Sequence, residues 1–204
     1  SHFFESRMTV PWELRPARLD VGCLQHGPIT MDWDATWQAH RRFHAHWETR
    51  LKEEAAAIRE SGADLVIGNN PYLAMAAGAA AGVPAVALAS LSWDEILDEH
   101  VDQAQPWQHA ILEDMRRAYG RATLLLRIAP GLPMPAFPRT KDIGPIATPL
   151  PSARDRLRAH LQIPNDEALV LLAFGGIPLE HLPFDRMESM PGIRFLIAGP
   201  VPPQ

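Results

Sequence analysis

The sequence predicts an α/β protein built on Rossmann-like parallel sheets, and three observations support this class. Short apolar runs of strand length alternate with segments of helical periodicity, the order expected when helices cover a parallel sheet. Each run stops at small or polar residues, where a helix would begin. A proline-rich stretch, "TPLPSARD", separates two such sets, so we expect one domain over residues 1–148 and an incomplete second domain over residues 149–204.

Composition and charge exclude several classes of protein. With 204 residues, 47% apolar and 21% charged, the chain has the make-up of a globular protein. Its formal net charge of -5 and scattered basic residues offer no surface for nucleic acid. No apolar run reaches the roughly 18 residues that span a bilayer, and the single cysteine, Cys23, excludes an internal disulfide and suits a cytoplasmic location. The first residue is not Met, and the last residues directly follow an apolar run, so we expect a fragment of a longer protein.

One long helix is predicted over residues 33–61. Its larger or less polar residues recur every three or four positions, as they do on one face of a helix. They are Trp33, Trp37, His40, His44, Trp47, Leu51, Ala55 and Ile58. Thr30 and Asp32 offer capping oxygens at its start, and Gly62 stands where a helix usually ends.

A strand, a helix and a second strand follow in order. "DLVIG" is a short apolar strand, and Asn70 before Pro71 is a usual opening for a helix. The helix that follows, "PYLAMAAGAAAG", consists mostly of small residues, so it can lie very close to a sheet. "VPAVALAS" is the next strand, and Ser92 with Glu95 has the spacing of a capping box that starts another helix.

The rest of the chain continues the alternation. A helix is predicted over residues 106–119, followed by the apolar "TLLLRIA", a proline-rich loop and the short "DIGPIA". We place the domain boundary near residues 148–152. Beyond it come an amphipathic helix at "RDRLRAHL" and strands at "ALVLLAF" and "IRFLIAGP", which again call for a parallel sheet.

Polar residues cluster where the first two strands end. In open parallel sheets, ligands bind outside the carboxyl ends of the strands, near helix N-termini. The residues that we expect to line such a pocket are Asn69, Asn70, Ser92, Trp93 and Asp94. Trp93 would offer a stacking face for a sugar, and Asp94 would accept hydrogen bonds from the hydroxyl groups of that sugar. Asp94 lies in a first helical turn, where the helix dipole favours its ionised form. The alternative is that Asn70 and Ser92 only cap helices while Trp93 packs.

Two further stretches are less specific. His26 lies with Asp32 in a loop after an apolar run, where it either contacts substrate or belongs to a turn at Gly27. Gly175 and Gly176 end a strand of the second domain. Paired glycines let a backbone approach a phosphate closely or simply make a tight turn.

His40 and His44 stand one helical turn apart, a spacing that can bind metal. No H-E-x-x-H pattern completes a site and both lie on the apolar stripe, so we expect no metal. The chain contains no G-x-S-x-G, G-x-G-x-x-G or Walker motif. The catalytic residues therefore stay unassigned, and we expect no cofactor.

Several stretches together resemble a known family. "LDVGCLQHGPITMDWDATW", "ADLVIGNNPYLAMAAGAAAGVPAVALASLSWDEIL", "DIGPIA" and "LVLLAFGG" are similar, in order and spacing, to the glycosyltransferase-like segment at the N-terminus of L-arabinokinases and in related bacterial proteins. These resemble in turn the UDP-glycosyltransferases of GT-B architecture, which have two Rossmann-like domains. The resemblance covers residues 3–200, and its most specific piece is the strand that leads to "SWD".

The resemblance implies an enzyme that transfers a sugar from a nucleotide-sugar donor to a small-molecule acceptor. Ser92, Trp93 and Asp94 would face the cleft between the domains. Gly175 and Gly176 would lie near the donor phosphates. The family's loop with a catalytic base would precede the first residue of this chain. Two other functions stay open: a nucleotide-sugar epimerase of the same fold, for which Asp94 alone supplies too few carboxylates, and a non-catalytic sugar-binding or regulatory module.

Overall fold

The computed structural model describes residues 2–27, 29–173 and 182–198. They form two compact units. Unit 1 comprises the residues up to 22 together with 37–145, and unit 2 comprises residues 23–36 and those from 146 onward. The boundary that we place between residues 148 and 149 stays a prediction.

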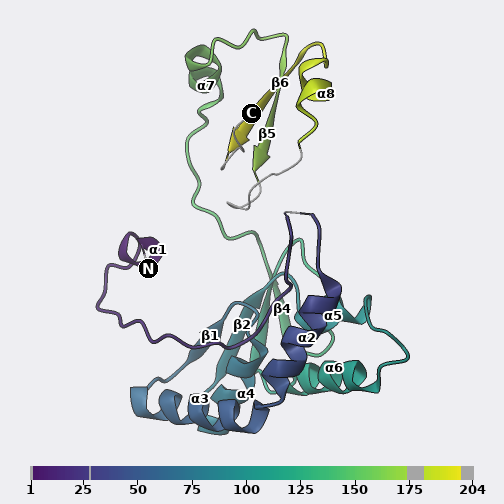
Figure 1. The fold of residues 1–204 in the computed structure, drawn as a ribbon. Coiled ribbons are helices and arrows are strands. Elements are labelled where there is room, and N and C mark those ends of the chain that lie inside the picture. Colours follow the sequence, from purple (N-terminus) through teal and green to yellow (C-terminus); the bar gives the residue numbers. More distant parts are fainter. Residues whose placement is uncertain (1, 28, 174–181, 199–204) are drawn as a thin grey trace. The chain divides into compact units, whose positions relative to one another are not determined.

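A parallel sheet forms the centre of unit 1 (Figure 1). Its strands, in spatial order, are β1 (Val66–Gly68), β2 (Ala85–Ala89), β3 (Leu124–Ile128) and β4 (Thr140–Ile143). Gly68 pairs with Ala87, and Ala89 pairs with Arg127. Because all neighbouring strands run parallel, their carboxyl ends share one edge of the sheet. The predicted Rossmann-like α/β class is confirmed.

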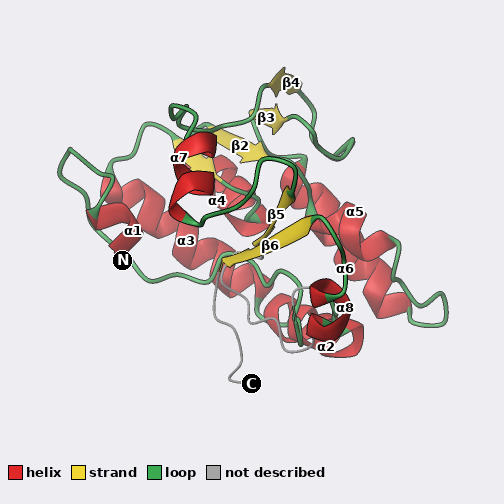
Figure 2. Ribbon diagram, turned by 90° about the horizontal axis from the view of Figure 1, so that it is seen from above, coloured by secondary structure: helices red, strands yellow, loops and turns green. Residues whose placement is uncertain are grey.

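Helices α3, α4 and α6 pack side by side in unit 1, with α4 in the middle and against β1 and β2 (Figure 1, Figure 2). The helices are α1 (His2–Glu5), α2 (Trp33–His44), α3 (Trp47–Ser61), α4 (Tyr72–Ala81), α5 (Trp93–Asp98) and α6 (Pro106–Tyr119). The close approach expected for α4 is confirmed: a Cβ on Gly78 would lie only 2.9 Å from the Cβ of Ala85 in β2.

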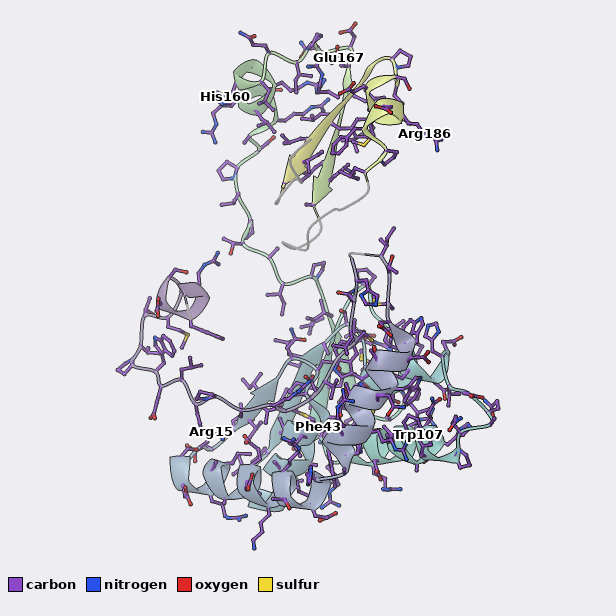
Figure 3. The ribbon with its side chains drawn as sticks, viewed as in Figure 1. Arg15, Phe43, Trp107, His160, Glu167 and Arg186 are labelled. Carbon is purple, nitrogen blue, oxygen red and sulfur yellow. The ribbon has the colours of Figure 1, made fainter. Side chains whose placement is uncertain are left out.

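The prediction of one long helix over residues 33–61 is wrong, because α2 ends at His44 and α3 begins at Trp47. The break accompanies an aromatic cluster around Tyr72, a residue of α4. The ring centroids of Phe43, His44 and Trp47 lie 5.7, 5.6 and 5.9 Å from that of Tyr72. Phe43, labelled in Figure 3, is 3% exposed. Packing against a remote ring therefore redirects the chain, whereas the predicted end of the helix at Gly62 is confirmed.

Unit 2 contains a second parallel pair of strands, β5 (Ala168–Ala173) and β6 (Ile193–Ala198), with the short helices α7 (Arg154–His160) and α8 (Phe184–Glu188). Within this unit the buried Arg158 donates to the backbone oxygen of Pro164 at 3.0 Å. Gly175 and Gly176 lie outside the described residues. In the part of the chain that is described, no helix is long and apolar enough to cross a membrane.

Candidate functional site

The candidate site lies in unit 1, at the edge of the sheet where the loops after β1 and β2 meet. Tyr119, the last residue of α6, joins these two loops through its hydroxyl group. The hydroxyl oxygen lies 2.9 Å from the backbone oxygen of Asn70 and 3.0 Å from Oδ1 of the same residue. It also accepts from the backbone N–H of Trp93 at 3.3 Å. The structure thus gathers Asn70 and Trp93 around one buried hydroxyl.

Asn70 does not cap α4, although the sequence suggests that it could. Its φ of 72° places it in the left-handed region, which Asn tolerates better than most residues. The N-cap of α4 is Pro71, and no side chain caps this helix. Asn70 is 6% exposed, and its Nδ2 has no hydrogen-bond partner in the described structure. The side-chain oxygen of Asn70 is therefore hydrogen-bonded to Tyr119, while its side-chain nitrogen, a donor, has no partner among the described residues.

Asp94 is buried in the first turn of α5 and has one unengaged oxygen. It is 2% exposed, and its Oδ1 has no hydrogen-bond partner among the described residues. Its Oδ2 lies 3.7 Å from Nε of Arg116, which also binds Asp98 at 3.0 Å. Burial raises the pKa of Asp94 in spite of the hydrogen bond from the Ser92 side chain, the Arg116 charge and the backbone N–H groups at the helix start. The helix start favours the ionised form of Asp94, as the sequence predicts, but desolvation is the larger effect on its pKa.

Trp93 is half-buried, and its indole ring is held by a segment far away in the sequence. The indole N–H donates to Oδ2 of Asp20 at 2.9 Å. The ring packs near Gly22, where a Cβ would come within 3.4 Å of it. Gly22 has a φ of 72°, so another residue there would be strained as well as crowded. Burial raises the pKa of Asp20. Sequence reasoning missed Asp20, because nothing in "LDVGCL" marks it as a partner of Trp93.

Ser92 and Glu95 do not form the predicted capping box. Ser92 is fully buried and makes no capping hydrogen bond, and its Oγ instead donates to Oε2 of Glu95 at 3.4 Å. The same Oε2 accepts from the backbone N–H of Met134 at 2.7 Å. Glu95 therefore ties the loop that follows β3 to the start of α5, so that three consecutive loops build this edge of the sheet.

Asn69 and His26, the remaining predicted residues within the described ranges, are not among the hydrogen-bond partners of Tyr119. Asn69 is exposed at the end of β1. His26 belongs to unit 2, where its Nε2 lies 2.8 Å from Oδ2 of Asp32. Asp32 also accepts from the backbone N–H of Ala35 at 2.8 Å, which confirms it as a cap of α2. His26 therefore contacts the carboxylate that caps α2, and its contact with a substrate stays a prediction.

His40 is a structural residue of the core of unit 1. It is fully buried, with Nε2 3.0 Å from the backbone oxygen of Gly22 and Nδ1 3.3 Å from the hydroxyl of Tyr72. Burial lowers the pKa of His40 to about 4, so its ring is neutral at pH 7. Among the described residues no group of three or more His, Cys, Asp or Glu side chains could hold a metal ion.

Comparison with known proteins shows a distant similarity to an enzyme of sugar metabolism. Over 167 residues, which are 81% of this chain, the sequence is 29% identical to L-arabinokinase of Arabidopsis thaliana. The chain spans only 16% of the length of that protein. No family model matches the chain, and no solved structure does.

Proposed function

We propose that the chain is the sugar-binding part of a glycosyltransferase-like enzyme. In this proposal unit 1 binds the acceptor at the carboxyl edge of its sheet, and unit 2 contributes to the binding of a nucleotide-sugar donor through Gly175 and Gly176. The parallel sheets of the two units and the similarity to a protein named for a sugar support it.

One observation carries the proposal: two buried polar atoms near the same edge of the sheet have no partner. They are Nδ2 of Asn70, a donor, and Oδ1 of Asp94, an acceptor. Buried polar groups are nearly always hydrogen-bonded, and leaving one unpaired costs about 1–3 kcal/mol. Hydroxyl groups both donate and accept, so a molecule with several hydroxyls satisfies either atom. Together with the partly exposed ring of Trp93, this is the chemistry of a sugar site.

The surrounding residues hold this arrangement in place. Tyr119 fixes Asn70 and Trp93 relative to each other, and Asp20 fixes the orientation of the indole ring. The burial that raises the pKa of Asp94 also strengthens any hydrogen bond that its carboxylate accepts, because the local dielectric is low. Asp94 would bind an acceptor hydroxyl directly, whereas Tyr119 and Asp20 are positioning residues.

The test is sugar binding by the full chain, followed by amide NMR shifts. The probes are pentoses and hexoses, L-arabinose among them because the relative's name specifies that sugar. Asp94→Asn is expected to weaken binding of the best sugar by at least about tenfold, roughly 1.4 kcal/mol. The substitution removes the charge and replaces one carboxylate oxygen, an acceptor, with an NH₂ group at a buried position. Trp93→Phe should weaken it less, because it keeps a stacking ring.

Asp98→Asn is the matched control. It removes a carboxylate of the same helix that also binds Arg116, but Asp98 is half-exposed. The affinity of the Asp98→Asn variant for the sugar should stay within about twofold of that of the wild type. Equal affinities for Asp94→Asn and wild type, with both folded, would show that the cluster is structural. Sugar binding without transfer from any nucleotide-sugar would instead favour the non-catalytic binding module.

A further inference from the structure

A groove of about 540 Å³ lies among helices α2, α3, α4 and α6 of unit 1, and none of the described residues that line it belongs to the loops after β1 and β2. Its floor is α4, which presents Ala76 and Ala80. One wall is formed by the end of α2 and the first turns of α3, and the other by α6 and Arg121, two residues beyond its end. The side chains that form the walls are His44, Trp47, Glu48, Leu51, Asp114, Arg117, Ala118 and Arg121. The groove exists because the middle helix has only methyl side chains at these positions, and its volume lies in the range of small-molecule sites.

The groove contains a buried side chain whose hydrogen-bonding capacity is unmet. The His44 side chain is 6% exposed, and neither ring nitrogen has a well-formed hydrogen bond in the described structure. Its Nδ1 lies 3.4 Å from Oδ2 of Asp114. The ring is stacked on that of Trp47, with centroids 5.3 Å apart and planes 10° from parallel. Such a group is costly to leave unpaired, so the groove is incomplete as a purely structural contact.

Positive charge and unpaired N–H groups also gather at the groove. Arg117 forms an ion pair with Asp114, but Arg121, beyond the end of α6, has no ion-pair partner in the described part of the chain. The N-terminus of α3 opens onto the groove at Trp47 and Glu48, and no side chain caps it. A long helix with an uncapped N-terminus favours a negatively charged group nearby. Two carboxylates line the groove and oppose this, Glu48 and Asp114, but Asp114 already pairs with Arg117 and lies 3.4 Å from Nδ1 of His44.

We propose that this groove binds a small phosphorylated molecule, with its phosphate between Arg121, Arg117 and the start of α3, and its body on the floor formed by α4. Guanidinium groups bind phosphate oxygens with two N–H donors each. Arg117 lies in the last turn of α6 and Arg121 lies two residues beyond its end, and both line the groove. A hydroxyl on the body of the ligand would meet the His44 ring. The site is distinct from the sheet edge and would serve to regulate or anchor the protein.

The test is a titration of the full chain with three probes, followed by amide NMR shifts. They are inorganic phosphate, ribose 5-phosphate and ribose. We expect ribose 5-phosphate to shift the amide signals of Ala76 and Ala80 and to bind at least about tenfold more tightly than inorganic phosphate. Ribose should leave the signals of Ala76 and Ala80 unchanged, whether or not it binds at the sheet edge. Equal binding of the two phosphates would assign the site to the free ion, and no localised shift up to about 10 mM would refute the proposal.

Three charge variants decide whether the wall residues bind the phosphate. Arg121→Gln should weaken binding of ribose 5-phosphate by about fivefold or more, and Glu48→Gln should strengthen it, because it removes a like charge. Arg42→Gln is the matched control, since Arg42 is an exposed residue of α2 outside the groove. If Arg121→Gln lowers the melting temperature but leaves binding of ribose 5-phosphate unchanged, Arg121 only stabilises the negative C-terminal end of α6, and the proposal fails. Equal weakening by Arg42→Gln would likewise refute it by showing non-specific attraction.

Discussion

The buried ring of His40 predicts a specific loss of stability in acid. Its pKa is lowered from 6.5 to about 4 in the folded chain, chiefly by burial and further by the charges of His44 and Arg18, while the bond to the backbone oxygen of Gly22 acts in the opposite direction. The perturbation is a drop in pH from 7.5 to about 4, applied to the wild type and to His40→Gln, whose side chain does not titrate.

The magnitude follows from the shift in pKa. An unfolded chain binds a proton at His40 below pH 6.5, but the folded chain does so only below about pH 4. The stabilisation is therefore complete above pH 6.5 and is lost as the pH falls from 6.5 to 4. A difference of about 2.5 units at about 1.36 kcal/mol each gives roughly 3 kcal/mol. Asp20 and Asp94, whose pKa values are raised, act in the opposite direction, but they are present in both proteins and cancel in the comparison.

Urea unfolding followed by tryptophan fluorescence measures the effect, because every tryptophan except Trp33 belongs to unit 1. The stability gap between wild type and His40→Gln should shrink by about 3 kcal/mol between pH 7.5 and pH 4. A gap that stays constant within about 0.5 kcal/mol would refute the reasoning. If the variant does not fold, the wild-type His40 ring resonances decide the question: titration near pH 6.5 would show that the ring is solvated.

Three further outcomes are expected. Gly78→Ala should destabilise unit 1 by about 1–3 kcal/mol in urea, because its Cβ would overlap β2, whereas Gly144→Ala, with no atom within 4 Å of the new Cβ, should be neutral. Limited proteolysis should cut within residues 146–154, and a resistant segment there, with other loops cut, would move the domain boundary. Zinc titration should show no site tighter than about 10 micromolar, and a tight site abolished by His40→Ala would overturn the expectation that His40 and His44 bind no metal.

The sequence predicts the elements whose signals are local. The helix expected over residues 106–119 is α6, because Pro106 opens it, a periodic apolar face runs through it and Gly120 follows it. The short apolar runs become strands in the expected order. The break between α2 and α3 could not be predicted, because it depends on the ring of Tyr72, which packs there from another helix. Periodicity records the face of a helix but not where a tertiary contact interrupts it.

The position of the candidate site is predictable, but its chemistry is not. Strand ends identify the loops that hold Asn70, Trp93 and Asp94. Their partners come from far away: Asp20 is 73 residues from Trp93, and Tyr119 is 49 residues from Asn70. No local pattern reveals such pairs. Burial is equally hidden, because a carboxylate that reads as accessible in the sequence is 2% exposed in the fold, and its pKa is raised for that reason.

Burial also decides the order in which a ligand would meet these residues. Asn69 is exposed and Trp93 and Asp20 are half-buried, whereas Asn70 and Asp94 are more than nine-tenths buried. In the proposed site, a sugar ring would therefore contact the indole first, and one of its hydroxyl groups would have to reach the two buried atoms. Water has the same size and the same donors and acceptors, so it competes for these positions. Affinity would then come from the stacked ring, and selectivity from which hydroxyl replaces the water at Asp94.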